Sequence, residues 1–170
     1  MKLPEVINNY NVYDEDTNKL IGVSDEVTLP NIESKTATIA GAGLLGEYDA
    51  PVLGQFNAME TDIPFRMLYG DVFKLFKLNK TTKLTFRGSE QVMADGELEH
   101  IALKVSIRGR AKSLEPGKLK GGESMGSSVK LALHYIKIDV DGKTKLLIDV
   151  LNGKFEVDGK DMLSKISKNC

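Results

Sequence analysis

The sequence contains 170 residues, of which 41% are hydrophobic and 28% are charged. This length predicts one domain over residues 1–170 with one hydrophobic core, and the composition disfavours disordered, collagen-like and membrane-embedded chains. The 23 basic and 24 acidic residues give a formal net charge of −1. Net charge therefore provides no general attraction to nucleic acid or anionic lipid.

The first ten residues, MKLPEVINNY, lack the apolar stretch of a secretory signal, and 18 apolar residues never run together. We expect neither a signal peptide nor a membrane-spanning helix, and no association with membranes by the chain itself. The single cysteine is Cys170, so an intramolecular disulfide is excluded and synthesis in a reducing cytoplasm is expected.

Short segments rich in Val, Ile, Thr and Phe, separated by turn residues, are typical of an antiparallel sheet protein. The N-terminal half predicts strands over residues 19–23, 26–29, 35–40 and 55–63. Between the last two lies the glycine-rich stretch 41–54, GAGLLGEYDAPVLG, for which neither helix nor strand is predicted. Loops of this length are usually functional in compact domains, so this stretch is a candidate for partner contacts.

The one predicted helix covers residues 64–78. Its apolar residues recur with helical spacing, Asp62 lies near the expected N-cap, and Pro64 is tolerated in a first turn. Lysines 74, 77 and 80 lie where the helix dipole favours cations. We expect this helix to cover the apolar face of the sheet rather than to serve a partner, because a sheet with one bare apolar face needs a cover.

The C-terminal half predicts strands over residues 83–88, 100–110, 129–140, 143–149 and 154–157. Residues 100–110 alternate between apolar and polar, which predicts one buried and one wet face. In residues 129–140 the apolar positions change parity, which predicts a bulge or bend near Tyr135 or Ile136. Asp141-Gly142 and Asp158-Gly159 predict tight hairpin turns, and residues 114–128 form a second long stretch with no assigned element.

Motifs for catalysis and cofactor binding are incomplete. The G-x-G-x-x-G pattern of residues 41–46 is not followed by the helix that a dinucleotide site requires. The turn at residues 139–142 lacks the remaining calcium ligands, and His100 and His134 have no second ligand at metal-binding spacing. No serine nucleophile motif is found, so we expect no enzyme, no catalytic residue, no cofactor and no metal.

The ordered set of turn and strand fragments resembles the major tail tube proteins of contractile-tailed phages and R-type bacteriocins such as R-type pyocins. The resemblance extends over nearly the whole chain, and its specificity comes from the order and spacing of the fragments. They are Val27-Thr28-Leu29-Pro30, Gly41-Ala42-Gly43 with Ala50-Pro51-Val52, Phe86-Arg87-Gly88-Ser89, Ile107-Arg108-Gly109-Arg110, Glu115-Pro116-Gly117, Lys120-Gly121-Gly122-Glu123, Val140-Asp141-Gly142, Ile148-Asp149, Asn152-Gly153 and Val157 through Leu163.

The resemblance implies a mainly β fold, a sandwich or barrel of the tail-tube type, with the helix packed outside. It also implies that six subunits form a ring, that each gives four strands to one barrel, and that rings stack into a tube inside a contractile sheath. Twenty-four strands about 4.8 Å apart and tilted near 40° enclose a backbone diameter of roughly 45 to 50 Å. The implied partners are sheath, baseplate and tail-terminator proteins, with double-stranded DNA only as transported cargo in a phage.

Three groups of residues are candidates for assembly contacts and the lumen. The expected contacts between rings are Gly41, Ala42, Gly43, Leu44, Leu45, Gly46, Tyr48 and Pro51. The expected contacts with a neighbouring subunit or the sheath are Lys118, Lys120 and Glu123. The expected lumen residues are Lys104, Ser106, Arg108, Lys130 and His134. The expected location is the bacterial cytoplasm during assembly, then a virion tail or a released bacteriocin particle.

Other classes remain open from the residues alone. A monomeric ligand-binding β-barrel is the main alternative, and it predicts a small-molecule cavity with the long loops closing over it. An enzyme with dispersed catalytic residues predicts a buried group with a strongly shifted pKa. The tube ring of a secretion system is a further alternative within the assembly class.

Overall fold

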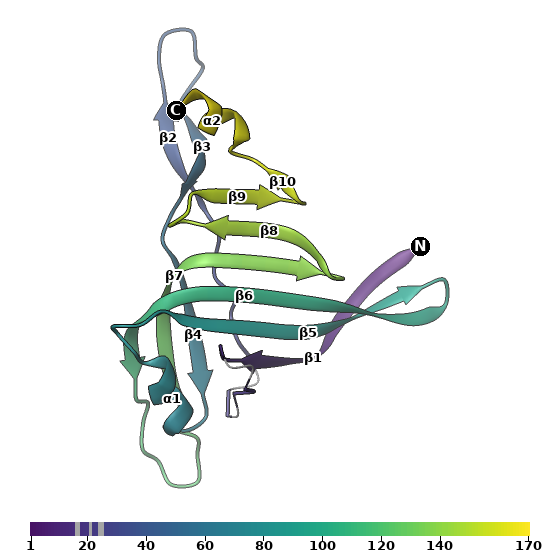
Figure 1. The fold of residues 1–170 in the computed structure, drawn as a ribbon, viewed down its shortest axis with the longest axis vertical. Coiled ribbons are helices and arrows are strands. Elements are labelled where there is room, and N and C mark those ends of the chain that lie inside the picture. The colour runs from purple at the N-terminus through teal and green to yellow at the C-terminus, as the bar shows by residue number, and fades with distance from the viewer. Residues whose placement is uncertain (16–17, 21, 24–25) are drawn as a thin grey trace.

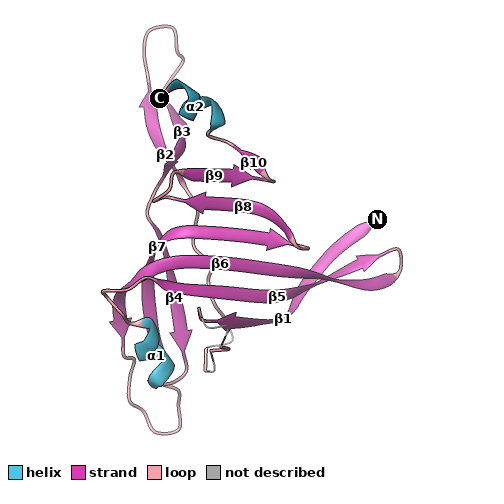
Figure 2. Cartoon of the chain, viewed as in Figure 1, coloured by secondary structure: helices cyan, strands magenta, loops and turns pink. Residues whose placement is uncertain are grey.

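The protein is dominated by antiparallel strands in a computed structural model that describes residues 1–15, 18–20, 22–23 and 26–170 (Figures 1 and 2). The expected fold class, mainly β, is confirmed. The strands are β1 (Lys2–Tyr13), β2 (Ser34–Ile39), β3 (Tyr48–Phe56), β4 (Met59–Phe65), β5 (Thr82–Ala94), β6 (Glu97–Glu115), β7 (Ser127–Val140), β8 (Lys143–Asp149), β9 (Lys154–Val157) and β10 (Lys160–Asp161). Two short helices are α1 (Gly70–Leu75) and α2 (Ser164–Asn169). In the described part of the chain, no helix has the length and apolar character needed to cross a membrane.

Eight strands form one sheet in the order β1-β5-β6-β7-β8-β9-β10, with β4 added beside β7. Strand β7 has two partners on the edge away from β6. Its first half, from Ser127 to Leu133, pairs with β4, and its second half, from Tyr135 to Val140, pairs with β8. Figure 1 shows the result: β4 and the start of β7 run along the long axis of the molecule, whereas β5, β6, β8 and β9 run across it.

The change of direction comes from a bulge. Arg108 of β6 lies opposite Tyr135, but Gly109 lies opposite Leu133, so His134 is the extra residue on β7. This confirms the bulge predicted near Tyr135 or Ile136, one residue earlier than expected. A Cβ at Gly109 would lie 2.2 Å from the carbonyl oxygen of Ala132. Glycine therefore permits the close approach of the two strands at the bend.

One face of the bent sheet carries the core. Leu84, Val105, Ile107, Ile136 and Ile148 are at most 1% exposed and come from four neighbouring strands. The other face of β5, β6 and β7, here called the open face, carries the intervening polar residues. Strand β6 therefore has the predicted buried face and wet face.

The predicted helix over residues 64–78 is much shorter in the structure. Phe65 is the last residue of β4, opposite Ser127, and α1 begins only at Gly70. Pro64 fits a strand because β7 is the one named strand that pairs with β4 in the described part of the chain, and an edge strand tolerates a residue without an N–H. Asp62 is consequently a strand residue and not an N-cap. Val72 and Leu75 are buried, so the expected packing of the helix against the core is confirmed.

Several other boundaries differ from the prediction. Strand β1 was not predicted, since its Asn-rich sequence has low strand propensity, and β10 and α2 were not predicted either. Residues 26–29 were predicted as a strand but form none. In the predicted strand 19–23, Lys19 and Val23 form isolated bridges, and Ile21 lies outside the described residues. The predicted strand 55–63 is two strands with a break at residues 57–58, and residues 48–54 of the expected long loop belong to β3.

Asp-Gly turns close three hairpins. Asp141 and Asp158 both have a φ of 52°, and each is followed by a glycine with positive φ. This confirms both predicted turns, because an aspartate-glycine pair tolerates the left-handed backbone that a two-residue hairpin requires. A third turn of this kind, Asp95-Gly96, joins β5 to β6.

Candidate assembly surfaces

The β2–β3 hairpin forms a separate two-stranded sheet and extends away from the main sheet (Figure 1). Its turn contains Gly41 to Gly46, and Tyr48 and Pro51 lie at the start of β3. Leu44 is 54% exposed, Leu45 is fully exposed, and a Cβ at Gly41 would meet no atom within 4 Å. Just below the turn, the hairpin is ordered by strand pairing and by a 2.8 Å hydrogen bond from Thr38 Oγ1 to Asp49 Oδ1. Exposed apolar side chains on an ordered projection are typical of a contact with a partner.

The second expected contact segment is the loop between β6 and β7, residues 116–126, and it is anchored at its base. The backbone N–H of Lys118 donates to the carbonyl of Met125, and that of Met125 donates to the carbonyl of Arg66. At its outer end, Lys120 Nζ lies 2.7 Å from Glu123 Oε1. Lys120 and Glu123 thus pair with each other, while Lys118 is exposed and Leu119 is 88% exposed.

Of the expected lumen residues, three lie together and two lie apart. Lys104, Ser106 and Arg108 share the open face of β6, directly opposite Asp139, Lys137 and Tyr135 of β7 respectively. Lys130 lies beyond the bend and pairs in register with Asp62 of β4. The expected set is therefore divided by the bulge.

His134 belongs to the bend itself. Its carbonyl accepts a 2.9 Å hydrogen bond from the N–H of Val150, and its Nδ1 is buried without a partner among the described residues. Asp149 lies nearby. Burial alone would raise the pKa of the Asp149 carboxyl, but hydrogen bonds from the side chain and backbone of Asn152 and from the backbone of Leu151 outweigh burial and lower it. These hydrogen bonds hold His134 and Asp149 in place at the bend, which indicates a structural role for both residues.

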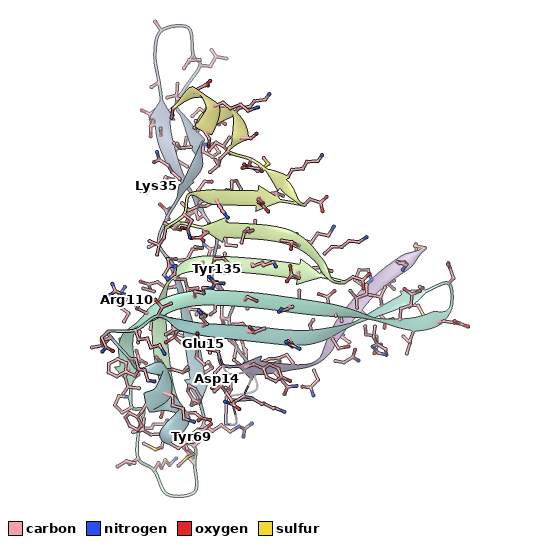
Figure 3. All side chains as sticks on the ribbon, in the orientation of Figure 1. Asp14, Glu15, Lys35, Tyr69, Arg110 and Tyr135 are labelled. Carbon is pink, nitrogen blue, oxygen red and sulfur yellow. The ribbon has the colours of Figure 1, made fainter. Side chains whose placement is uncertain are left out.

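Two tyrosines complete the open face. The Arg87 guanidinium lies 5.3 Å from the ring centre of Tyr13, and the Arg108 guanidinium lies 4.2 Å from that of Tyr135. In the view of Figure 3, Tyr135 is labelled above β5 and β6 and Glu15 below them. Neither Tyr13 nor Arg87 was predicted to lie on this face. The signal available for Arg87 was its alternation with Leu84 and Phe86 along β5, which places it away from the core.

An apolar groove lies on the core side of the sheet, away from α1. It has a volume of about 160 Å³ and is lined by Ile7, Tyr10, Val27, Leu29, Phe86, Gly88, Leu103 and Val105. Ile7 is 49% and Leu29 is 43% exposed. This volume is below the roughly 300 to 1,000 Å³ of typical small-molecule pockets. Among the residues that the structure describes, no group of three His, Cys, Asp or Glu side chains is arranged to hold a metal ion.

Comparison with known proteins identifies the family. The profile of the family described as "Phage tail tube protein FII" matches residues 4–170. The chain belongs to the phage tail tube protein FII family. The family that the sequence fragments resembled is thereby confirmed, and with it the expected role as a structural tail tube protein. The match favours this role over the monomeric ligand-binding barrel.

Two curated relatives of this FII-family chain are similar over most of its length. It is 27% identical to the tail tube protein of Escherichia phage P2 over 149 residues, which cover 87% of each chain. It is also 27% identical to the major tail tube protein of Serratia phage KSP20 over 164 residues, covering 95% of this chain and 92% of the relative. Both relatives carry the name of a structural tail component.

A solved structure supports the fold. The FII-family chain aligns with a TM-score of 0.54 and 14% identity to a chain in a cryo-electron microscopy structure titled as the sheath/tube terminator of an extracellular contractile injection system, PVC, in the extended state. The alignment covers 80% of this chain and 96% of that chain. At this identity the similarity concerns the fold alone.

Proposed function

We propose that six copies of this chain close into a ring and that the rings stack into the hollow inner tube of a contractile injection apparatus. Membership of the tail tube family over residues 4–170 is the observation that carries this proposal. In it, residues 1–170 act as one domain without catalytic activity, assembled in the bacterial cytoplasm and then located in a virion tail or a released particle.

The strand order supports ring formation. Strand β1 is at one end of the sheet and β10 at the other, so each subunit presents two edges. Unpaired edges are an aggregation hazard in a monomer, but head-to-tail contacts between edges close a ring when the rotation fits. The wet open face of β5, β6 and β7 is the candidate lining of the lumen, because a large barrel filled with water has a polar interior.

The two projecting segments supply candidate contacts outside the ring. In this proposal the tip of the β2–β3 hairpin reaches the adjacent ring, since burying Leu44 and Leu45 removes their apolar surface from water. The loop of residues 116–126 contacts a neighbouring subunit or the surrounding sheath through Lys118 and Leu119. Baseplate and terminator proteins are the proposed partners at the tube ends, and double-stranded DNA is the cargo if the particle is a phage.

Negative-stain electron microscopy across a concentration series, together with light scattering, tests this proposal. The wild-type protein should form rings or hollow tubes, and a strict monomer at all concentrations would contradict the proposal. The double variant Leu44→Ser, Leu45→Ser should form rings that do not stack. Leu151→Ser is a matched control, because Leu151 is 73% exposed in the turn between β8 and β9. Equal loss of tubes in both variants would contradict a specific role of the hairpin.

A further inference from the structure

The turn between β8 and β9 contains the one Asn-Gly pair of the sequence, Asn152-Gly153. Both residues are exposed. A Cβ at Gly153 would meet no atom within 4 Å, so the space around this residue is open. The N–H of Gly153 donates no hydrogen bond within the part of the chain that the structure describes. The backbone nitrogen that follows Asn152 is therefore free to react with the side-chain amide.

An asparagine followed by glycine can lose its amide without an enzyme. The Gly153 nitrogen gives up its proton to solvent and bonds to Asn152 Cγ, while the Cγ–Nδ2 bond breaks and Nδ2 leaves as ammonia. Water then opens the cyclic imide at one of its two carbonyls, which leaves aspartate or isoaspartate at position 152. One water is consumed, one ammonia is released and no atom changes oxidation state. A cavity of about 80 Å³, lined in part by Asp149 and Gly153, gives water room beside the turn.

The amide that would be lost is a structural contact. Asn152 Nδ2 donates a 2.7 Å hydrogen bond to Asp149 Oδ2, and the backbone N–H of Asn152 donates one of 3.2 Å to Oδ1. Asp149 is only 8% exposed. Its neighbour Val150 donates from its N–H to the carbonyl of His134, the extra residue of the bulge in β7. Through these bonds the turn is tied to the bend of the sheet.

Deamidation would reverse the sign of the contact with Asp149. A carboxylate oxygen would replace Nδ2, so the hydrogen bond would be lost and two carboxylates would face each other, which disfavours their charged forms. Isoaspartate would also add one carbon to the backbone between β8 and β9. The turn would then no longer match the register in which Asp149 lies opposite Lys154.

We infer that Asn152 is a site of spontaneous deamidation, and that this reaction weakens the turn holding Asp149 as the folded protein ages. The loss of ammonia makes the change irreversible in water, so altered chains accumulate with time. The inference does not depend on ring formation, because one chain supplies every contact on which it rests.

Peptide mass spectrometry of the aged protein tests the reaction. Trypsin cleavage after Lys145 and Lys154 releases residues 146–154, in which Asn152 is the one asparagine. Incubation of the wild-type protein at mildly alkaline pH should raise the mass of this peptide by about 1 Da. Gly153→Ala should react at least ~10-fold more slowly, because the added methyl group crowds the attacking nitrogen. Gly159→Ala is the matched control, since Gly159 also has a positive φ and open space in a turn, and it should react like the wild type.

Thermal unfolding tests the consequence. Asn152→Asp imitates one product and should lower Tm by roughly 2 to 4 °C. Asn152→Ala removes the same hydrogen bond without adding charge, so it should lower Tm by less. Asn79→Asp is the matched control, because it adds the same charge at an exposed position before β5, and its Tm should stay near that of the wild type.

Two results would overturn the inference. One is a folded protein whose peptide 146–154 keeps its mass while a synthetic peptide of the same sequence is converted under the same conditions, since the fold would then protect Asn152. The other is an Asn152→Asp protein as stable as Asn79→Asp, since the turn would then not depend on the amide.

Discussion

Replacement of Gly109 by alanine should strongly destabilise the fold, because Gly109 lies where β6 and β7 approach at the bend. An added Cβ would lie 2.2 Å from the carbonyl oxygen of Ala132, 2.9 Å from its carbonyl carbon and 2.9 Å from Leu133 Cδ2. The first distance is about 1 Å inside van der Waals contact, and its partner is backbone, so the strands themselves must separate. Overpacking of this kind costs about 3 kcal/mol.

The free energy of unfolding of Gly109→Ala is measured by thermal and guanidinium unfolding at low protein concentration, where assembly does not contribute. For a chain of this size, a loss of about 3 kcal/mol lowers Tm by roughly 6 to 12 °C. Gly88→Ala is the matched control, since Gly88 is in the adjacent β5 and its Cβ would meet nothing closer than the Asn9 carbonyl oxygen at 3.7 Å. A Gly109→Ala protein as stable as the Gly88→Ala protein would refute the close approach of the strands.

Two further predictions concern one side chain beside a turn of the sheet and one within a turn. The lowered pKa of Asp149 means that its contribution to stability is complete above the pKa of the unfolded chain, about 4, and is lost as pH falls through the lower folded pKa. Asp149→Asn should therefore lower the free energy of unfolding by about 1 to 2 kcal/mol at pH 7. Denaturation curves at decreasing pH should show the wild type losing more stability than the variant below pH 4. Equal losses of stability in the two proteins would contradict this role. Asp141 has a φ of 52°, which a β-branched residue adopts poorly. Asp141→Val should therefore lower the free energy of unfolding by about 1 to 2 kcal/mol, whereas Asp141→Asn should leave it nearly unchanged. Equal unfolding midpoints for these two variants would be inconsistent with the turn.

The open face shows how net charge and local charge differ in this protein. A formal charge of −1 gave no reason to expect a cationic surface. Antiparallel pairing of β5 with β6 across the Asp95-Gly96 turn aligns Arg87 with Lys104, and the alternation of side chains sends Glu97 and Glu99 to the other side. Cross-strand register therefore sets the local electrostatic potential, because it decides which charged side chains lie opposite each other, and composition does not specify that register.

The sequence by itself determined the class of fold, most of the C-terminal strands and two hairpin turns. Alternation over residues 100–110 reflects burial of one sheet face, and the Asp141-Gly142 and Asp158-Gly159 turns reflect local backbone preference. Each of these signals is short in range and independent of the rest of the chain. The change of parity along β7 likewise predicted the bulge, because a one-residue slip reverses the faces of a strand.

Only the tertiary structure decided the course of residues 57–78 and the grouping of the assembly surfaces. The apolar spacing around Phe65 fits a helix, but pairing of β4 with the first half of β7 places this residue in a strand, and tertiary hydrogen bonds override a local pattern. The bulge at His134 directs Lys130 towards β4 and leaves Lys104 and Arg108 on the open face. Long-range strand pairing joins residues far apart in sequence, so periodicity and propensity, which act over a few residues, do not determine it.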